Sequence, residues 1–223
     1  MSNSSKPNIG AVMVLIHHAI TRGIEVSKKQ TITFELSGFK DQAIKEGFVT
    51  YVRTLGWVIN AHHQGEDHVV FPYLRFKLPD APYDQLVAEH GEMDVFLKEL
   101  QVTIEAVSTQ TQGDALLNIL ISSLTGLAEL WAPHIEKEQF YLYDIAKTEA
   151  VMDENEQIKL IQDVSKHSQQ QGNPAFMVPF VLYNLQSEER ANMSQTMPPD
   201  LIKNLVPIAW KKQWSPMQPF LLD

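Results

Sequence analysis

The sequence predicts an all-α protein, an up-down four-helix bundle followed by a C-terminal helical extension. In four long segments, apolar residues recur at steps of three and four, the period of an amphipathic helix. Each of these segments also carries a histidine on its apolar face. Strand-like alternation is not convincing anywhere in the chain. Four amphipathic helices that turn polar side chains inward are typical of bundles that hold metal ions between the helices.

The four bundle helices are expected at residues 9–28, 39–76, 83–107 and 114–147. On the first helix, Met13 and Ile20 lie on the apolar face. The segment KKQTITFELSG should connect this helix to the second. Two prolines lie inside predicted helices: Pro72 should kink the second helix, and Pro133 should kink the fourth or introduce a bulge.

Residues 9–148 are expected to form the bundle, and residues 149–223 an extension packed on it. The extension differs in composition, since seven of the twelve prolines follow residue 153. Its aromatic residues, which include Trp210 and Trp214, make it too apolar for a linker. Short helices fit the stretches DENEQIKLIQDVSKHSQQ, PAFMVPFVLYNLQS and PPDLIKNLVPIAWKKQW.

Composition narrows the possible functions. The 223 residues include no cysteine, which excludes disulfides, thiolate metal sites, iron–sulfur clusters and cysteine nucleophiles. The net charge of −9 and the lack of basic runs argue against a nucleic-acid partner. No apolar run approaches the roughly 20 residues that span a membrane, and the N-terminus shows no secretion signal. We therefore expect a cytoplasmic protein without membrane association.

Helical phase selects the histidines that face the bundle interior. His17 lies on the apolar face of the first helix, whereas His18 lies on a face that turns polar. On the second helix, His62 and Glu66 lie four residues apart on an apolar face. His63 lies on a mixed face, so its pairing with the aspartate four residues later is less favoured, and it would stand behind the ligands. The inward-facing candidate metal ligands are His17, His62, Glu66, His90, Asp94, His134 and Glu138.

Three of these candidates are carboxylates on faces that otherwise bury apolar groups: Glu66, Asp94 and Glu138. A buried carboxylate is costly unless it is paired or bound to a metal. Two divalent ions and a bridging hydroxide or oxide would balance the charge. Six or seven nitrogen and oxygen ligands are too many for a single tetrahedral ion, so the pattern favours a pair of ions.

Four stretches of the chain resemble the hemerythrin-like, histidine–histidine–glutamate cation-binding family. They are HHAITRGI, HHQGEDHVVFPYL, EHGEMDVFL and HIEKEQFYLY, and the resemblance covers about residues 9–148. It implies two non-haem iron ions bridged by Glu66 and Glu138, with terminal histidines from all four helices. The C-terminal region resembles a helical extension of some bacterial members of this family.

The chain departs from the oxygen-carrying hemerythrins at two positions. Those proteins use five histidines and two carboxylates, with a second histidine on the third helix where this chain has Asp94. Their fourth-helix carboxylate lies five residues after the histidine, whereas Glu138 lies four after His134. The site is therefore expected to be poorer in nitrogen and richer in carboxylate, which favours ferric iron. Asp94 would be either a ligand or a residue that orients a ligand histidine.

The expected function is to bind or sense oxygen, nitric oxide or peroxide, or to handle iron, with a small diatomic molecule or peroxide as the ligand. One alternative is a di-iron oxidase or peroxidase. The other is a helical interaction module in which the metal is structural, or is zinc or manganese. The residues alone do not identify the metal, the physiological ligand or a protein partner.

Overall fold

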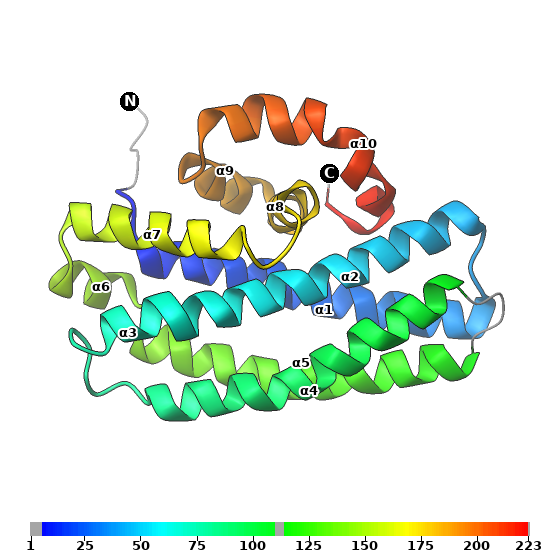
Figure 1. Ribbon diagram of the computed structural model, residues 1–223, viewed down its shortest axis with the longest axis horizontal. Helices are drawn as coiled ribbons and strands as arrows, with labels where there is room; N and C mark the ends of the chain where they lie inside the picture. The colour runs from blue at the N-terminus through cyan, green and yellow to red at the C-terminus, as the bar shows by residue number, and fades with distance from the viewer. Residues whose placement is uncertain (1–5, 110–113, 223) are drawn as a thin grey trace.

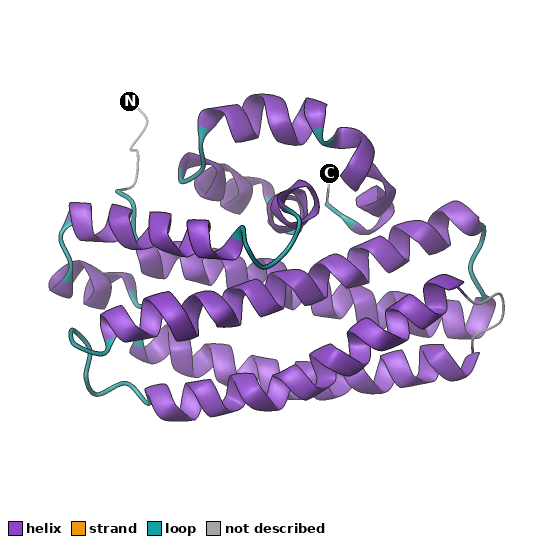
Figure 2. Cartoon of the chain, viewed as in Figure 1, coloured by secondary structure: helices purple, strands orange, loops and turns teal. Residues whose placement is uncertain are grey.

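The computed structural model describes residues 6–109 and 114–222. Four long antiparallel helices form an up-down bundle (Figure 1): α1 (Ile9–Ser37), α2 (Gln42–Gly65), α4 (Tyr83–Thr109) and α5 (Asp114–Tyr141). Neither described range contains a strand (Figure 2). The predicted all-α bundle with a C-terminal helical extension is therefore confirmed. Residues 110–113, between the predicted third and fourth helices, lie outside the described residues.

Helix α1 is longer than predicted, because the segment expected to connect it to α2 is helical. Its β-branched residues fit the helix since the hydroxyl of Thr31 donates to the carbonyl of Ser27, at 2.7 Å. Phe34 continues the buried face of the helix. The helix ends where Gly38 adopts a φ of 70°, a left-handed conformation that favours glycine.

The irregularity predicted at Pro72 takes the form of a π-helical segment. Helix α2 runs into this segment, η1 (Glu66–Val70), and then into the short helix α3 (Phe71–Leu74). Pro72 has no backbone N–H, and its ring crowds the preceding turn; the wider π-helical turn accommodates both effects. Such segments are frequent at functional sites, and this one begins at a candidate ligand.

Helix α5 remains α-helical through Pro133, so the predicted bulge is not present in this described helix. The helix also ends earlier than predicted. The amides of Leu142 and Tyr143 both donate to the carbonyl of Glu138, at 2.7 and 3.1 Å, which closes the last turn. A separate short helix, α6 (Ile145–Val151), follows.

The C-terminal extension lies along α1 and α2, on the side of the bundle away from α4 and α5 (Figure 1). Its segments are α7 (Glu154–Ser168), α8 (Pro174–Tyr183), α9 (Ser187–Gln195), η2 (Leu201–Ala209), α10 (Lys211–Trp214) and η3 (Ser215–Phe220). Phe180, Met217 and Phe220 of the extension belong to the same apolar core as Phe48 and Leu55 of α2. The extension therefore completes the core of the bundle on this side.

The buried apolar side chains form two separate cores, which follow one another along the bundle helices. The larger core includes Ile20 and Leu55, and the smaller core includes Met13, Phe71 and Leu86. Met13 and Ile20 are seven residues apart on α1, roughly 10 Å along the axis. That distance leaves room for one layer of side chains between the two cores.

Helices α1 and α5 are each long and apolar enough to cross a lipid bilayer, with mean hydropathies of 1.3 and 1.5 over 18 residues. The sequence expectation of no spanning segment considered only uninterrupted apolar runs. Both helices place buried polar residues in the bundle interior, His17 in α1 and His134 in α5. In this structure they are packed helices of the bundle.

Candidate metal centre

Five histidines and two glutamates meet in the layer between the two cores. They are His17, His62, His63, Glu66, His90, His134 and Glu138, and none is more than 5% exposed. On α1, the inward histidine has Met13 of the smaller core on one side and Ile20 of the larger core on the other. On α4, Leu86 and Met93 flank the inward histidine in the same way. At this level of the bundle, polar residues thus interrupt the apolar face of each of the four helices.

Four of these residues define a first cation position: His17, His62, Glu66 and Glu138. One ligand atom of each lies within 4.8 Å of those of the others. Nε2 of His17 is 3.2 Å from Oε2 of Glu138, and Nε2 of His62 is 3.2 Å from Oε2 of Glu66. Both histidines of this position come from the α1–α2 side of the bundle.

The same two glutamates, together with His90 and His134, define a second cation position. The Nε2 atoms of these histidines are 3.0 Å apart, and Nε2 of His134 is 3.2 Å from Oε1 of Glu138. His63 joins this position, since it groups with both histidines and stacks on His90 with ring centroids 4.1 Å apart. Because Glu66 and Glu138 belong to both positions, the layer could hold two neighbouring cations that share these carboxylates.

The buried polar atoms of the layer fit such a pair of cations. Within the described residues, no hydrogen-bond partner is found for Nε2 of His17, both ring nitrogens of His62 and His63, Oε2 of Glu66, or either carboxylate oxygen of Glu138. Burying such an atom without a partner costs roughly 1–3 kcal/mol. Cations would accept these lone pairs, and imidazole with carboxylate suits iron, manganese or zinc. The residues present therefore fit a bound metal pair.

Burial and contacts with carboxylates together set the protonation of the layer. Burial opposes a charge on His90, but contacts with Asp67, Glu138 and Glu66 raise its pKa to about 12. Burial and the nearby charge of Glu138 raise the pKa of Glu66 to about 8. Burial lowers the pKa of His62 and of His63 well below the usual value, which keeps both imidazoles neutral at pH 7. Burial also opposes ionisation of Glu138, but contacts with three of the cluster histidines hold its pKa well below the usual range. Neutral imidazole is the form in which histidine binds a metal.

Two further carboxylates orient the histidines of the second position. Nδ1 of His90 donates to Asp67 at 2.8 Å, and Nδ1 of His134 donates to Glu89 at 2.9 Å. Glu89 also accepts a hydrogen bond from Lys137. With a metal bound, these contacts would leave each Nε2 lone pair directed at the cation position and strengthen it as a donor.

Aromatic side chains enclose the layer. The ring of Trp131 lies 5.7 Å from those of His17 and His62, and its indole N–H donates to Thr21 at 2.9 Å. Phe71 stacks on one histidine of the second position at 5.7 Å. The hydroxyl of Tyr143 donates to Oε1 of Glu66 at 2.5 Å. Sequence reasoning did not single out Tyr143, which lies inside the helix predicted to residue 147 but beyond the observed end of α5 at Tyr141.

Asp94 does not join the layer. It lies one turn after His90, but it is only partly buried, and it belongs to no group of possible ligands within the described residues. The inward residue of that turn is Met93, which is fully buried. Asp67, rather than Asp94, makes the hydrogen bond to His90. The structure therefore supports neither of the two roles predicted for Asp94.

His63 corrects the predicted phase of α2. It is 1% exposed and faces α4 and α5, whereas its sequence neighbour His62 faces α1. Two adjacent residues are buried here because α2 lies between neighbours on both sides. The signal was available in the sequence, since Glu66 lies four residues from His62 and three from His63, both contact spacings on a helix. With His63 included, the layer contains five histidines and two glutamates, so the nitrogen-poor site predicted from Asp94 is not what the structure shows.

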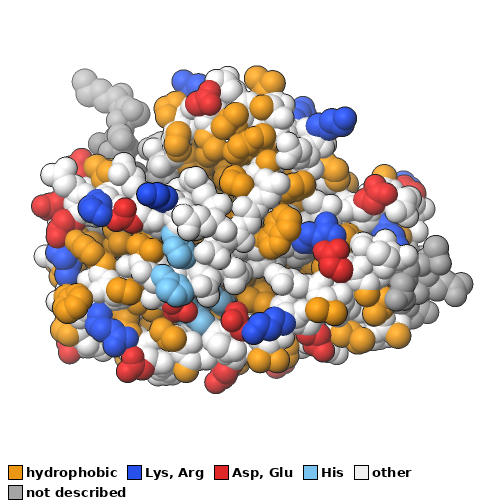
Figure 3. Space-filling view, in the orientation of Figure 1, with side chains coloured by type: hydrophobic (Ala, Val, Ile, Leu, Met, Phe, Trp, Pro, Cys, Tyr) orange, Lys and Arg blue, Asp and Glu red, His pale blue; other side chains and the backbone are white. Residues whose placement is uncertain are grey.

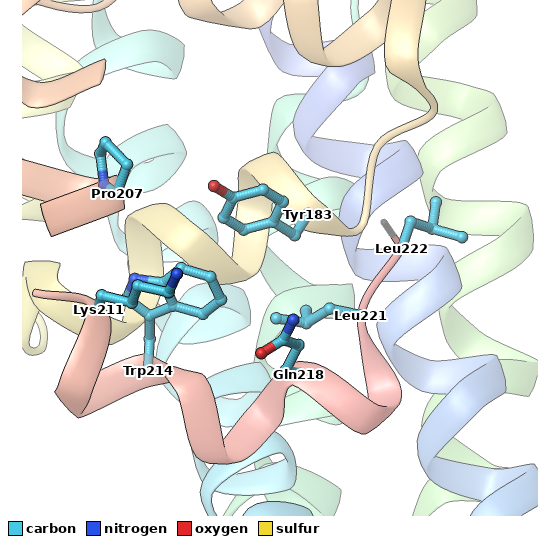
Figure 4. Close-up of a pocket in the computed structure, with 7 residues that line it drawn as sticks. All are labelled: Tyr183, Pro207, Lys211, Trp214, Gln218, Leu221 and Leu222. Atoms are coloured by element: carbon cyan, nitrogen blue, oxygen red, sulfur yellow. The ribbon is translucent and has the colours of Figure 1, made fainter. Parts of the chain in front are cut away.

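The remaining histidines and the described cavity lie elsewhere. His18 pairs with Glu189 of α9 at 2.6 Å, and His68 stacks on His167 of α7 at the surface, where Figure 3 shows a group of histidine side chains. A cavity of about 200 Å³ in the extension (Figure 4) shares no residue with the layer. It is lined by Tyr183, Pro207, Lys211, Trp214, Gln218, Leu221 and Leu222.

The comparison with protein families agrees with the geometry. The family model of the hemerythrin HHE cation-binding domain matches residues 9–146, the part of the chain that contains all seven residues of the layer. No curated protein and no solved structure matches the chain significantly. The resemblance of the four helical stretches is thereby confirmed, and the chain belongs to the hemerythrin HHE cation-binding family, with a buried layer of histidines and glutamates suited to metal ions.

Proposed function

We propose that the protein holds two non-haem iron ions and binds oxygen, nitric oxide or peroxide at one of them. The observation that supports this proposal is the uneven donor set of the two positions. The first position has two histidines, and the second has three when His63, which groups with His90 and His134, is counted; both positions share two glutamates.

This difference in the number of histidine donors predicts where a ligand would bind. With a hydroxide or oxide shared between the ions, six-coordinate iron would be complete at the three-histidine position and one donor short at the other. The open coordination position would therefore lie beside His17 and His62. Iron there would supply an open coordination position and electrons to a small ligand.

The residues around the first position favour a small ligand. Trp131 presents its ring to both histidines, and its only polar atom is already bonded to Thr21. Tyr143 also borders this position, with its ring 5.7 Å from that of His17. Such walls would keep water and larger molecules away from a ligand bound there.

The second position supports oxidation more strongly than the first. Asp67 and Glu89 place negative charge behind His90 and His134, which increases electron donation to a cation and favours its higher charge. This observation favours the second candidate function, a di-iron oxidase or peroxidase. A structural zinc or manganese pair is the remaining alternative, and the same test separates it from both.

The test is metal analysis combined with absorption spectra of the reduced protein before and after oxygen, nitric oxide or peroxide. We expect about two iron ions per chain and a spectrum that returns when the ligand is removed. Sustained consumption of peroxide with a reductant would favour the enzyme instead. Zinc or manganese bound in preference to iron, without spectral change, would overturn the proposal.

A further inference from the structure

The two oxygens of Glu66 have different surroundings. Oε1 accepts the hydrogen bond from Tyr143 at 2.5 Å. Oε2 lies 3.2 Å from Nε2 of His62 and 3.4 Å from Nε2 of His90, and these histidines belong to different cation positions. One oxygen of Glu66 is therefore directed at both cation positions, while the other is held by a phenol.

Glu138 is arranged differently. Its Oε2 lies 3.2 Å from Nε2 of His17, in the first position. Its Oε1 lies 3.2 Å from Nε2 of His134 and 3.7 Å from that of His90, both in the second position. Glu138 thus offers one oxygen to each cation, and no O–H group of the described residues bonds to either.

Tyr143 is held firmly in place for this contact. Its backbone amide donates to the carbonyl of Glu138, so the phenol and the second glutamate are fixed in one turn. The side chain is 2% exposed and belongs to the smaller core. The backbone of α1 approaches closely at Gly10, where a Cβ would lie 2.6 Å from the carbonyl oxygen of Tyr143. A residue larger than glycine at position 10 would push Tyr143 away from Glu66.

We propose that Tyr143 is a positioning residue that holds Oε1 of Glu66, so that only Oε2 of Glu66 would serve the two cation positions, while Glu138 would offer one oxygen to each. The phenol lies beside the ring of His17, on the side of the first cation. By holding Oε1, it prevents Glu66 from chelating that cation through both oxygens. This consequence rests on the proposed function, because it keeps the open coordination position beside His17 and His62 available to a small ligand.

The test compares Tyr143→Phe with Tyr51→Phe in the full chain loaded with iron. Tyr51 is a similarly buried tyrosine whose hydroxyl donates to Asn184, at 2.7 Å. It lies on α2 fifteen residues before Glu66, about 22 Å along the axis, so its substitution removes a buried hydroxyl outside the layer. Infrared difference spectra, loaded minus metal-free, are recorded with ¹³C-labelled glutamate. Azide affinity of the oxidised protein is the second readout.

For the wild type and for Tyr51→Phe, we expect two pairs of antisymmetric and symmetric carboxylate stretching bands. The wide pattern has the large separation of a carboxylate that coordinates through one oxygen, and the narrow pattern has the small separation of a carboxylate that bridges through two. Tyr143→Phe should lose the wide pattern and bind azide about tenfold more weakly. Unchanged bands and azide affinity in Tyr143→Phe would overturn the inference. A wild type that binds two cations with two identical patterns would also overturn it, while leaving the proposed function intact. A wild type that does not take up iron would refute the proposed function instead.

Should Tyr143→Phe not fold, as judged by circular dichroism, difluorotyrosine at position 143 keeps the ring and donates a stronger hydrogen bond. We then expect the wide pattern to shift while the narrow one stays. Two unshifted patterns would overturn the inference.

Discussion

Two buried polar clusters of this molecule differ in how completely their hydrogen bonds are satisfied. Where the extension meets α1 and α2, the side chain of Asn184 accepts hydrogen bonds from Tyr51 at 2.7 Å and from Arg22 at 2.8 Å, and it donates to the carbonyl of Phe180 at 2.9 Å. In the layer between the two cores, by contrast, most buried nitrogen and oxygen atoms lack such partners within the described residues. The first cluster joins two parts of the fold, and the second is suited to a bound group.

This difference has an energetic meaning. A satisfied buried network contributes about 0.5–1.5 kcal/mol per hydrogen bond to stability. Unsatisfied groups, and the raised pKa of a buried carboxyl, reduce the stability of the metal-free fold. Residues of the first cluster should therefore affect stability without affecting metal content, and residues of the layer should affect metal content first.

The largest effect is expected for Glu138→Ala. Glu138 belongs to both cation positions, so its loss should remove both ions, with affinity reduced by more than about 100-fold, beyond what residues that merely support ligands contribute. Metal content after gel filtration measures this loss. Glu136→Ala, an exposed glutamate on the same helix, should keep both ions. A Glu138→Ala protein that still carries two ions would show that the two positions do not share this residue.

Removal of the metal should have the next largest effect. At a free metal concentration about 1,000 times the Kd, binding stabilises the folded state by about 4 kcal/mol, and chelation should lower the free energy of unfolding by that amount. Asn184→Ala should lower it by about 1–3 kcal/mol equally with and without metal, since it leaves the Tyr51 hydroxyl unpaired. Urea unfolding of both proteins in both states is the measurement. A metal-free wild type as stable as the loaded form would remove the distinction between the two clusters.

A smaller effect, the loss of one ion rather than two, is expected for His63→Ala. His63 belongs only to the second position, whereas Asp94, which the sequence favoured, belongs to neither. His63→Ala should therefore lose close to one ion per chain, and Asp94→Ala should keep both. If Asp94→Ala lost an ion and His63→Ala kept both, Asp94 rather than His63 would be the ligand in the metal-loaded protein, as predicted from the sequence.

The smallest effect concerns pH. Burial raises the pKa of Glu66 to about 8, so its proton stabilises the metal-free fold; this contribution is complete below the unfolded value and is lost as the pH rises through about 8. His62 and His63, whose pKa values are lowered, are neutral in both the folded and the unfolded chain above pH 7. Burial opposes a charge on His90, but contacts with Asp67, Glu138 and Glu66 raise its pKa to about 12, so His90 adds a loss of the same sign. Between pH 7 and 8, unfolding of the metal-free protein should therefore cost at least roughly 1 kcal/mol less per pH unit.

Metal binding must displace the same proton. Metal binding at His90, whose pKa is raised to about 12, displaces a further proton, so the apparent affinity should rise by at least about tenfold per pH unit below pH 8 and less steeply above it. Competition with a chelator of known pH dependence measures this slope. An affinity independent of pH between 6 and 8 would show that Glu66 is already ionised before metal binds.

The sequence by itself determined the helical class, the four bundle helices and most of the layer. Helical periodicity is a local property, and a histidine one turn from core residues must face where they face, as His17 does between Met13 and Ile20. Six of the seven residues proposed as ligands meet in the structure, with Asp94 as the exception. The helical connection after Lys28 could not be recognised, because its Thr and Ile residues have low helix propensity, and the burial of Thr31 and Phe34 compensates for it.

Tertiary structure decided what depends on neighbours far apart in the chain. His63 is buried because α4 and α5 cover the second side of α2. The pattern of apolar residues within α2 does not show that this second side is covered. Whether Tyr143 reaches Glu66 depends on Gly10 allowing α1 to approach the turn after α5. Helical phase assigns one inward direction to each residue, whereas a helix inside a bundle has several covered directions. Only the packed structure therefore separates the ligands of the layer from the residues beside them.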